Sequence, residues 1–245
     1  MKITKIIMGM PIAICVVDKA VDKKDIESIF TFFKSVDKQF SPYRKTSEVS
    51  KINRNEILLS AVSDVMKEIL ELSIQTKKDT HGYFDVDAKG YFDPSGMVKG
   101  WAIEKAVKML KKIGYKNFFI DAGGDMFVSG SKKGSLWNVG IRNPFNRDQI
   151  VKILELENCA IATSGTTIRG QHIVDPYHDK TLTEIVSMSV VGPSVIDADR
   201  FATAAFAMGR DGISFIESQE GVEGYMIDKH GMATYTSGFT NYVLS

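Results

Sequence analysis

The stretch "SGMVKGWAIEKAVKMLKKIG", residues 95–114, has its apolar side chains mostly at helical spacing. Gly114 follows as the expected C-terminal stop, so the pattern predicts an amphipathic helix. Lys99 lies in the first turn beside Gly100, just behind Asp93. A helix N-terminus already offers free N–H groups and partial positive charge. An added lysine therefore suggests a bound anion, and the alternative is a solvated lysine on an exposed face.

On both sides of this helix, the sequence alternates between helical and strand-like patterns. Apolar periodicity predicts helices over residues 22–40, 60–78 and 195–209. β-rich runs bounded by Gly, Asn and Pro predict strands within residues 6–17, 117–130, 136–141, 151–157 and 186–192. Shorter apolar pieces occupy residues 160–165, 172–176, 212–219, 224–228 and 232–236. Helices mixed with hairpin-like strands favour an α+β fold over a doubly wound parallel sheet.

Composition excludes several classes of protein. The chain has 245 residues, 44% of them hydrophobic and 25% charged, as in ordinary globular proteins. A formal net charge of +1 gives no global field toward nucleic acid or an anionic membrane. The two cysteines cannot form a disulfide framework, and each is expected to be buried. Pro11 interrupts the N-terminal apolar run, which argues against a signal peptide and predicts a cytoplasmic protein.

Two motifs carry carboxylates. In "DAGGD", Asp121 to Asp125, two glycines at the end of an apolar strand allow close backbone approach to a flat or phosphorylated ligand, or form a bulge in a sheet. In "IDADRFATAAFAMG", Asp199 and Thr203 are four residues apart and share one helix face. A carboxylate and a hydroxyl there suit Mg²⁺. The alternative is that Asp197 or Asp199 caps the helix and Thr203 bonds back to a carbonyl.

Two further motifs combine polar and aromatic residues. In "HIVDP", His172 beside Asp175 has the chemistry of an acid, a base or a phosphate ligand, although such a histidine also occurs as a packing residue. In "FSPYRKTSEVSKIN", Thr46 or Ser47 is expected to cap a short helix. Tyr43, Arg44 and Asn53 around that turn suit a ring-shaped ligand.

The order of these motifs is more specific than any one of them. The chain reads MG, SPYRxxSEVSKIN, GxFD, DxxGxxKGxA, GGD, ATSG, HIxDP and ADxxAT. That order, from Met8 to about Gly209, resembles the ApbE family of FAD:protein FMN transferases. The resemblance implies a single ApbE-like, T-fold-like α+β domain over residues 1–245. It would have mixed, largely antiparallel sheets with packed helices. The lipoprotein-type signal of many bacterial relatives is missing from the N-terminal residues, so the domain is expected to be without signal peptide or lipoprotein anchor.

The resemblance also implies a reaction. Family members bind FAD and Mg²⁺, transfer FMN to a threonine hydroxyl of a partner protein and release AMP. Lys99 would lie by the FAD pyrophosphate, His172 would serve as acid, base or phosphate ligand, and Asn53 would lie near the diphosphate. The metal ligands would be Asp199, Thr203 and the carbonyls of Gly96 and Ala202. The remaining positions matched to the FAD site are Met8, Tyr43, Tyr83, Phe84, Asp85, Asp93 and Ile173.

Departures from the family pattern leave alternatives open. The "MGM" stretch lacks the threonine that usually follows the glycine, and "HIVDPYHDKTL" lacks the usual Thr-Gly after "DP". The chain contains no copy of the family's acceptor pattern, so the acceptor hydroxyl is expected on another protein. The alternatives are an Mg-dependent FAD diphosphatase, with water as acceptor, and a non-catalytic FAD carrier.

Overall fold

The computed structural model describes residues 1–88, 90–166, 177 and 184–244. An eight-stranded sheet runs through the molecule in the order β1-β2-β3-β4-β7-β8-β9-β10. Every pairing between its strands is antiparallel. The strands are β1 (Lys2–Ile7), β2 (Met10–Val16), β3 (Phe118–Ala122), β4 (Asp125–Ser129), β7 (Cys159–Gly165), β8 (Ile185–Gly192), β9 (Glu223–Asp228) and β10 (Ala233–Tyr235). A separate hairpin joins β5 (Trp137–Arg142) and β6 (Ile150–Leu156).

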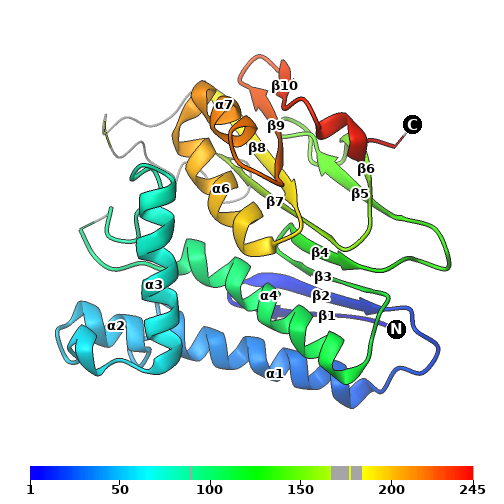
Figure 1. Cartoon of the computed structure of the whole chain (residues 1–245). Helices are drawn as coiled ribbons and strands as arrows, with labels where there is room; N and C mark the ends of the chain where they lie inside the picture. Colours follow the sequence, from blue (N-terminus) through cyan, green and yellow to red (C-terminus); the bar gives the residue numbers. More distant parts are fainter. Residues whose placement is uncertain (89, 167–176, 178–183, 245) are drawn as a thin grey trace.

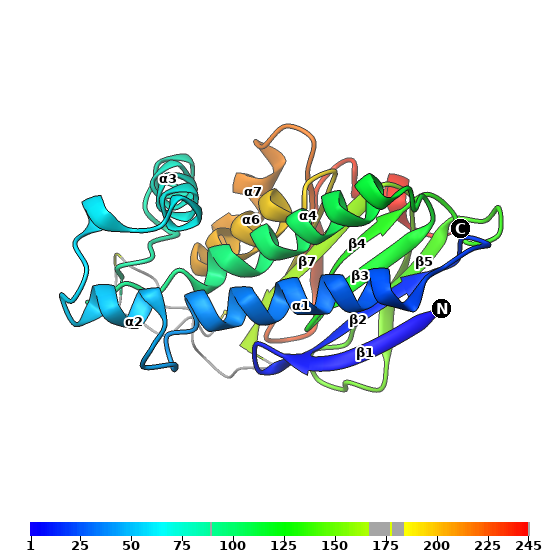
Figure 2. The same cartoon turned by 90° about the horizontal axis from the view of Figure 1, so that it is seen from below.

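Helices cover one face of the large sheet. They are α1 (Lys23–Phe40), α2 (Glu48–Asn53), α3 (Asp64–Asp79), α4 (Ser95–Ile113), α6 (Val195–Ala207) and α7 (Gly212–Glu217). Short 3₁₀ turns occupy Leu59–Ala61, Gly209–Asp211 and Phe239–Tyr242. In Figures 1 and 2, α1, α4 and α6 lie side by side across the sheet, whereas α2 and α3 extend beyond its edge. The architecture confirms the expected α+β class.

Local sequence accounts for the helix boundaries. Asp22, Ser47 and Ser63 accept hydrogen bonds from the first turns of α1, α2 and α3, which satisfies N–H groups that a helix leaves unpaired. Of the two candidate caps Thr46 and Ser47, the structure confirms Ser47, and the helix predicted to open near Asp22 is capped by that residue. Gly114 ends α4 in the left-handed region, with φ of 114°.

Two hydrophobic cores lie on opposite faces of the sheet. The larger one fills the space beneath the helices, with Phe30, Phe33 and Ile103 fully buried. The smaller one, around Trp137 and Phe239, packs the β5–β6 hairpin against the other face. Because both faces are covered, nearly every residue of β8 is buried. The layer order is therefore helices, eight-stranded sheet, hairpin.

The N-terminal β-rich run differs from its prediction. Strands were predicted within residues 6–17, but the first strand begins at Lys2, and the chain reverses at Met8 and Gly9 inside the predicted range. These two residues have φ of 56° and 72°, as in a type I′ hairpin turn. A methionine tolerates this backbone poorly, so the turn was not apparent from composition.

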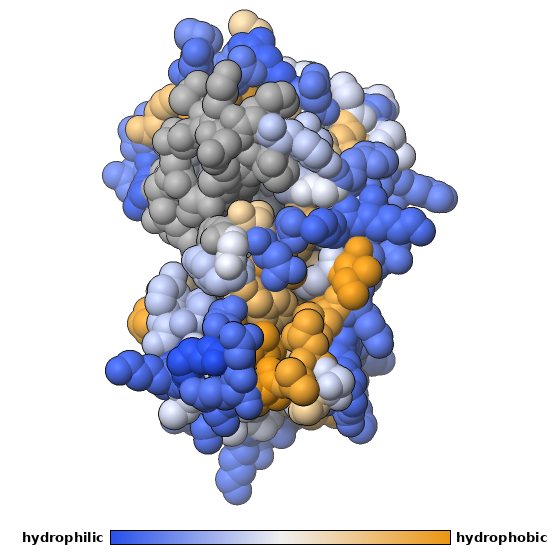
Figure 3. All heavy atoms as spheres, turned by 90° about the vertical axis from the view of Figure 1, so that its left-hand side faces the viewer, coloured by the Kyte–Doolittle hydropathy of each residue, from blue (hydrophilic) through white to orange (hydrophobic). Residues whose placement is uncertain are grey.

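The cysteines agree only in part with expectation. Cys159 is buried, whereas Cys15 is half-buried, and neither forms a disulfide. Apolar side chains also reach the surface around α3: Leu58, Leu59 and Ile74 are exposed. Figure 3 shows an apolar strip on the side of the molecule where α2 and α3 lie.

Candidate functional site

Three charged side chains meet where α4 and α6 cross above the sheet. Lys99 on α4 forms an ion pair with Asp125, the first residue of β4. Its Nζ also lies 3.3 Å from Oδ1 of Asp199 on α6. The two carboxylates are almost completely buried, and the lysine side chain is 18% exposed. This junction brings together residues separated by 100 positions in the sequence, and we call it the Lys99 cluster.

Gly100 allows the two helices to approach this closely. A Cβ atom at Gly100 would lie 3.0 Å from both the Val195 carbonyl oxygen and the Asp199 Cβ. The Gly100 N–H donates to Asp199 Oδ2 at 2.9 Å. In a regular helix that N–H would be directed at the Gly96 carbonyl. The Asp199 carboxylate is therefore held by a backbone donor from α4 as well as by Lys99.

Burial raises the pKa of Asp199 above the ordinary carboxyl value. The neighbouring Lys99 ammonium acts in the opposite direction, and the negative charge of Asp125 raises the pKa further. A buried carboxylate that resists ionisation gains from any additional positive charge placed beside it. The ionised form of Asp199 therefore depends on the positive charge of Lys99 beside it.

The "ATSG" motif lies directly below α6. Ser164 Oγ lies 3.2 Å from Thr203 Oγ1, so the two hydroxyls share a hydrogen bond. The Thr163 N–H donates to Asp125 Oδ1 at 3.2 Å, and its hydroxyl pairs with Ser189 at 2.8 Å. β7 thus supports both Asp125 and Thr203, a role that its sequence alone did not indicate.

The structure tests the capping alternative for the "DADRFAT" helix. Ser194 is its N-cap and accepts from the Asp197 N–H. Asp197 instead pairs with Arg200 at 2.7 Å. The capping role considered for Asp197 or Asp199 is therefore wrong. Asp199, Ala202 and Thr203 all lie on α6, and the side chains of Asp199 and Thr203 contact the neighbouring α4 and β7.

Asp93 lies two residues before the first residue of α4, with Pro94 between them. Its Oδ1 accepts from the Ser95 hydroxyl at 2.6 Å and from the Ser95 N–H at 3.2 Å. The preceding residue, Phe92, is clamped by Asn53: the amide donates to its carbonyl and accepts from its N–H, both at 2.9 Å. Asn53 is thus engaged with the backbone that leads into Asp93.

The turn from Tyr83 to Asp85 also lies next to the start of α4. Phe84 is buried and would lie 3.3 Å from a Cβ atom at Gly96. The Tyr83 ring packs edge-on against Tyr177 with centroids 5.0 Å apart. Asp85 pairs with Lys77 at 2.7 Å, which fixes the turn to the end of α3.

The structure shows less of the other predicted site residues in relation to the Lys99 cluster. Met8 occupies the β1–β2 turn, half-buried against the larger core. Tyr43 is 94% exposed in the loop before α2. His172 and Ile173 lie outside the described residues.

Sequence reasoning missed one member of the cluster. Asp125 had been considered only as part of the "DAGGD" motif, whose glycines were expected to approach a ligand or form a bulge. The glycines instead form the β3–β4 hairpin turn, with φ of 65° and 105°. Gly123 lies against Met10, where a Cβ atom would be 2.9 Å from the sulfur. The signal in the sequence that could have identified Asp125 was a carboxylate directly after a two-glycine turn.

Among the described residues, the Lys99 cluster offers mixed oxygen donors for a metal. Among the residues that the structure describes, no group of three or more His, Cys, Asp or Glu side chains could hold a metal ion. The Asp199 carboxylate, the Thr203 hydroxyl and nearby backbone carbonyls remain as donors. All are hard oxygen ligands, which suit Mg²⁺ rather than zinc.

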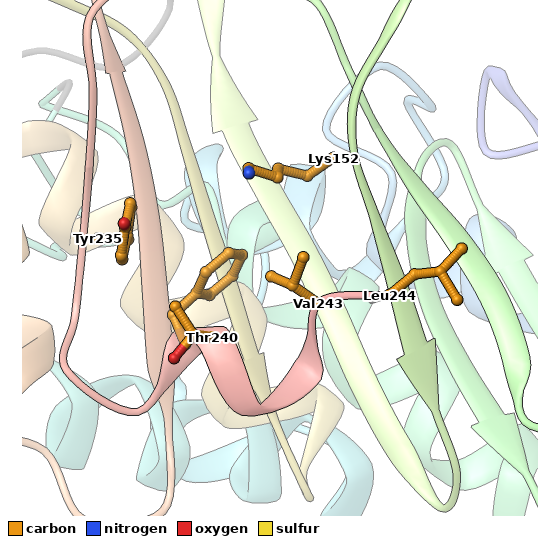
Figure 4. Close-up of a pocket in the computed structure, with 6 residues that line it drawn as sticks. Lys152, Tyr235, Thr240, Val243 and Leu244 are labelled. Carbon is orange, nitrogen blue, oxygen red and sulfur yellow. The ribbon is translucent and has the colours of Figure 1, made fainter.

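Two surface hollows lie elsewhere. One, of about 250 Å³, is lined by Lys152, Tyr235, Phe239, Thr240, Val243 and Leu244 (Figure 4). The other, of about 710 Å³, lies between the loop after β2 and the end of α4. Neither is lined by residues of the Lys99 cluster, so cavity size does not identify the site. Within the described chain, no helix has the length and apolar character needed to cross a membrane.

The chain is similar to a well-defined group of proteins. The model of the ApbE family matches residues 8–91 and 86–226. A Treponema pallidum protein named FAD:protein FMN transferase is 31% identical over 136 residues, covering 48% of this chain and 38% of that protein. The chain spans 38 to 43% of the first curated relatives that it matches.

Solved structures share the fold over the whole chain. The flavin transferase ApbE from Vibrio cholerae superposes with a TM-score of 0.86 at 23% identity, covering 99% of this chain and 98% of that one. The ApbE protein from Thermotoga maritima superposes with a TM-score of 0.89 at 20% identity, covering 100% and 99%. These similarities confirm the expected ApbE-like architecture.

Proposed function

The chain belongs to the ApbE family, and from that membership we propose that it is an FAD:protein FMN transferase. Its relatives carry that name. In the proposed reaction, FAD is the donor, a threonine hydroxyl of a separate protein is the acceptor and AMP is released. The cytoplasmic location remains a prediction from the sequence.

The observation that carries this proposal is the Lys99 cluster. Lys99 and the buried Asp199 meet in the first turns of α4, the helix that follows the Asp93–Ser95 hydrogen bond. Breaking a diphosphate builds negative charge on phosphoryl oxygens, and fixed cations and N–H groups stabilise that charge. An ammonium held by buried carboxylates is a preorganised positive charge of this kind. We propose that Lys99 acts on the FAD pyrophosphate.

The donor set also fits Mg²⁺. We propose that Asp199, Thr203 and the carbonyls of Gly96 and Ala202 hold the ion. Two observations support this set. The Gly100 N–H, which a regular helix would direct at the Gly96 carbonyl, donates to Asp199 Oδ2. The Ser164 hydroxyl shares a hydrogen bond with the Thr203 hydroxyl and so orients it. When bound, the cation stabilises charge on phosphoryl oxygens.

The proposed transfer balances as one displacement at phosphorus. The acceptor oxygen forms a bond to the phosphorus of the FMN half, while the bond from that phosphorus to the bridging oxygen breaks. AMP leaves with that oxygen, and the hydroxyl proton passes to a base, for which His172 remains the proposed group. Met8, Tyr43, Tyr83, Phe84, Asp85, Asp93 and Ile173 are proposed to line the FAD site.

Asn53 is proposed to act near the diphosphate through the backbone it holds. Both of its amide groups are engaged with Phe92, next to Asp93. This bonding supports a role in placing Asp93 rather than in proton transfer.

The decisive experiment incubates the protein with FAD and Mg²⁺, with and without a threonine peptide that carries the family's acceptor pattern. We expect AMP release together with a peptide that gains the mass of FMN. The same peptide with alanine in place of the threonine is the control. AMP and free FMN formed at one rate, with no peptide modification, would show a diphosphatase. Binding of FAD without AMP release would show a carrier.

A further inference from the structure

The role of Asp125 follows from its position in β4. Alternation along the strand puts Asp125 and Phe127 on the same face of the sheet. Phe127 belongs to the core beneath the helices, so Asp125 also faces the helix layer. The carboxylate is 2% exposed. A charged group in that position needs a partner that enters from a helix.

Lys99 is that partner. Asp125 Oδ1 accepts from the Thr163 N–H, and Oδ2 forms the ion pair with Lys99. Apart from this ammonium, no hydrogen-bond partner of Asp125 Oδ2 lies within the described residues. Removing one member of a buried pair leaves the other charge uncompensated, which is strongly unfavourable. The buried Asp125 on β4 and the Lys99 ammonium therefore hold each other in place.

The pairing of Lys99 with Asp125 matters because Lys99 has a second carboxylate, Asp199, within reach. Lys99 also lies 3.3 Å from Asp199, the proposed metal ligand. A lysine side chain is a flexible point charge and moves to wherever negative charge is available. If Asp199 binds a cation, Asp125 is the carboxylate left in the cluster to hold the ammonium in place.

We propose that Asp125 is the positioning residue for Lys99, holding its ammonium at the junction of α4, α6 and the sheet. The inference rests on the proposed function for what Lys99 does to FAD, but the placement of the ammonium can be tested without flavin. The proposal also assigns a role to the "GGD" motif. Its hairpin turn places the buried Asp125 carboxylate against the helix layer.

The first test measures the placement directly. Asp125→Asn keeps the shape and an acceptor for the Thr163 N–H but removes the charge. We expect several-fold faster acetylation of Lys99 by limiting acetic anhydride, measured by peptide mass spectrometry in the absence of ligands. Asp228→Asn is the matched control, because Asp228 is also buried, at the far end of β9. Unchanged Lys99 labelling in folded Asp125→Asn would overturn the proposal, whether or not the wild-type protein binds FAD.

The second test is a double-mutant cycle on flavin binding. Asp125→Asn should raise the Kd for FAD about tenfold, the lower range for loss of a charged hydrogen bond. In a Lys99→Gln background, the same substitution should change the Kd little, because a positioning residue acts only through its target. Equal effects in both backgrounds would indicate a merely structural role and contradict the proposal.

A milder variant covers the case in which Asp125→Asn does not fold. Asp125→Glu keeps the charge but displaces it by one methylene, and we expect an intermediate rise in both Lys99 labelling and the FAD Kd. Wild-type-like values in both assays would contradict the proposal. Failure of the wild-type protein to bind FAD would overturn the proposed function, and the labelling comparison would still decide the role of Asp125.

Discussion

The amide of Asn53 pairs with both backbone groups of Phe92, at 2.9 Å each. This pairing joins the end of α2 to the segment that leads into α4, across 39 positions of sequence. A single side chain thereby fixes the backbone on which Asp93 and the first turn of α4 depend.

Replacing Asn53 with alanine should therefore affect both folding and flavin binding. Loss of two hydrogen bonds predicts a fall of about 1–3 kcal/mol in the free energy of unfolding. We also expect a higher KM for FAD with a smaller change in kcat, because the substitution moves a binding segment. Urea unfolding and steady-state kinetics measure the two effects, with the exposed Asn138→Ala as control. A large loss of kcat with unchanged stability and KM would instead indicate direct participation in the chemistry.

Asp199→Asn should separate catalysis from stability. Removing a metal-ligating carboxylate is expected to reduce AMP release at saturating Mg²⁺ by at least about 100-fold. Folding should persist, because the capping of α6 depends on Ser194. Near-normal turnover in this variant would contradict the assignment of Asp199 as a ligand.

The same carboxylate predicts how stability depends on pH. Because burial raises the pKa of Asp199 in the folded state, the native protein binds more protons than the unfolded chain above the ordinary value of about 3.9. The contribution of this group to stability therefore decreases as pH rises from that value through the raised pKa. In metal-free buffer, Asp199→Asn should show a flatter pH dependence of the unfolding free energy, measured by denaturant titration. A steeper dependence than that of the wild type would contradict this prediction.

Gly100→Ala should force α4 and α6 apart. The added methyl group would meet the Val195 carbonyl and Asp199 Cβ at 3.0 Å, a cost of about 1–3 kcal/mol for overpacking. An unconstrained glycine in a helix would instead gain up to about 1 kcal/mol on becoming alanine. A fall in the unfolding free energy is therefore the expected sign, and a rise would contradict overpacking at the crossing of α4 and α6. We also expect weaker Mg²⁺ dependence of activity, because Asp199 would be displaced.

Ser164→Ala should weaken metal binding without altering the fold. Partners of metal ligands typically contribute about 10- to 100-fold to affinity. We therefore expect the Mg²⁺ concentration for half-maximal AMP release to rise about tenfold. Ser189→Ala is the control, since it removes another buried hydroxyl, one that pairs with Thr163 instead of Thr203. Equal shifts in the two variants would show that the effect is not specific to Thr203.

Much of the fold could be predicted from local patterns. The helix over residues 95–114 was found almost to the residue, because its periodicity and its terminal glycine act within a few turns. Capping by Asp22 and Ser47 was equally local. The β1–β2 turn was missed, because Met8 adopts a positive φ that methionine rarely has.

In the candidate site, too, local features could be predicted from the sequence, whereas contacts between distant elements could not. Residue spacing was enough to predict the helix face shared by Asp199 and Thr203 and the place of Lys99 in the first turns of its helix, because side chains four residues apart are related by helix geometry alone. The pairing of Lys99 with Asp125, the hydrogen bond between Ser164 and Thr203 and the contacts of Asn53 with Phe92 became apparent in the folded chain. These contacts join elements far apart in the chain. They depend on strand order and on the close helix crossing at Gly100, which no local pattern encodes.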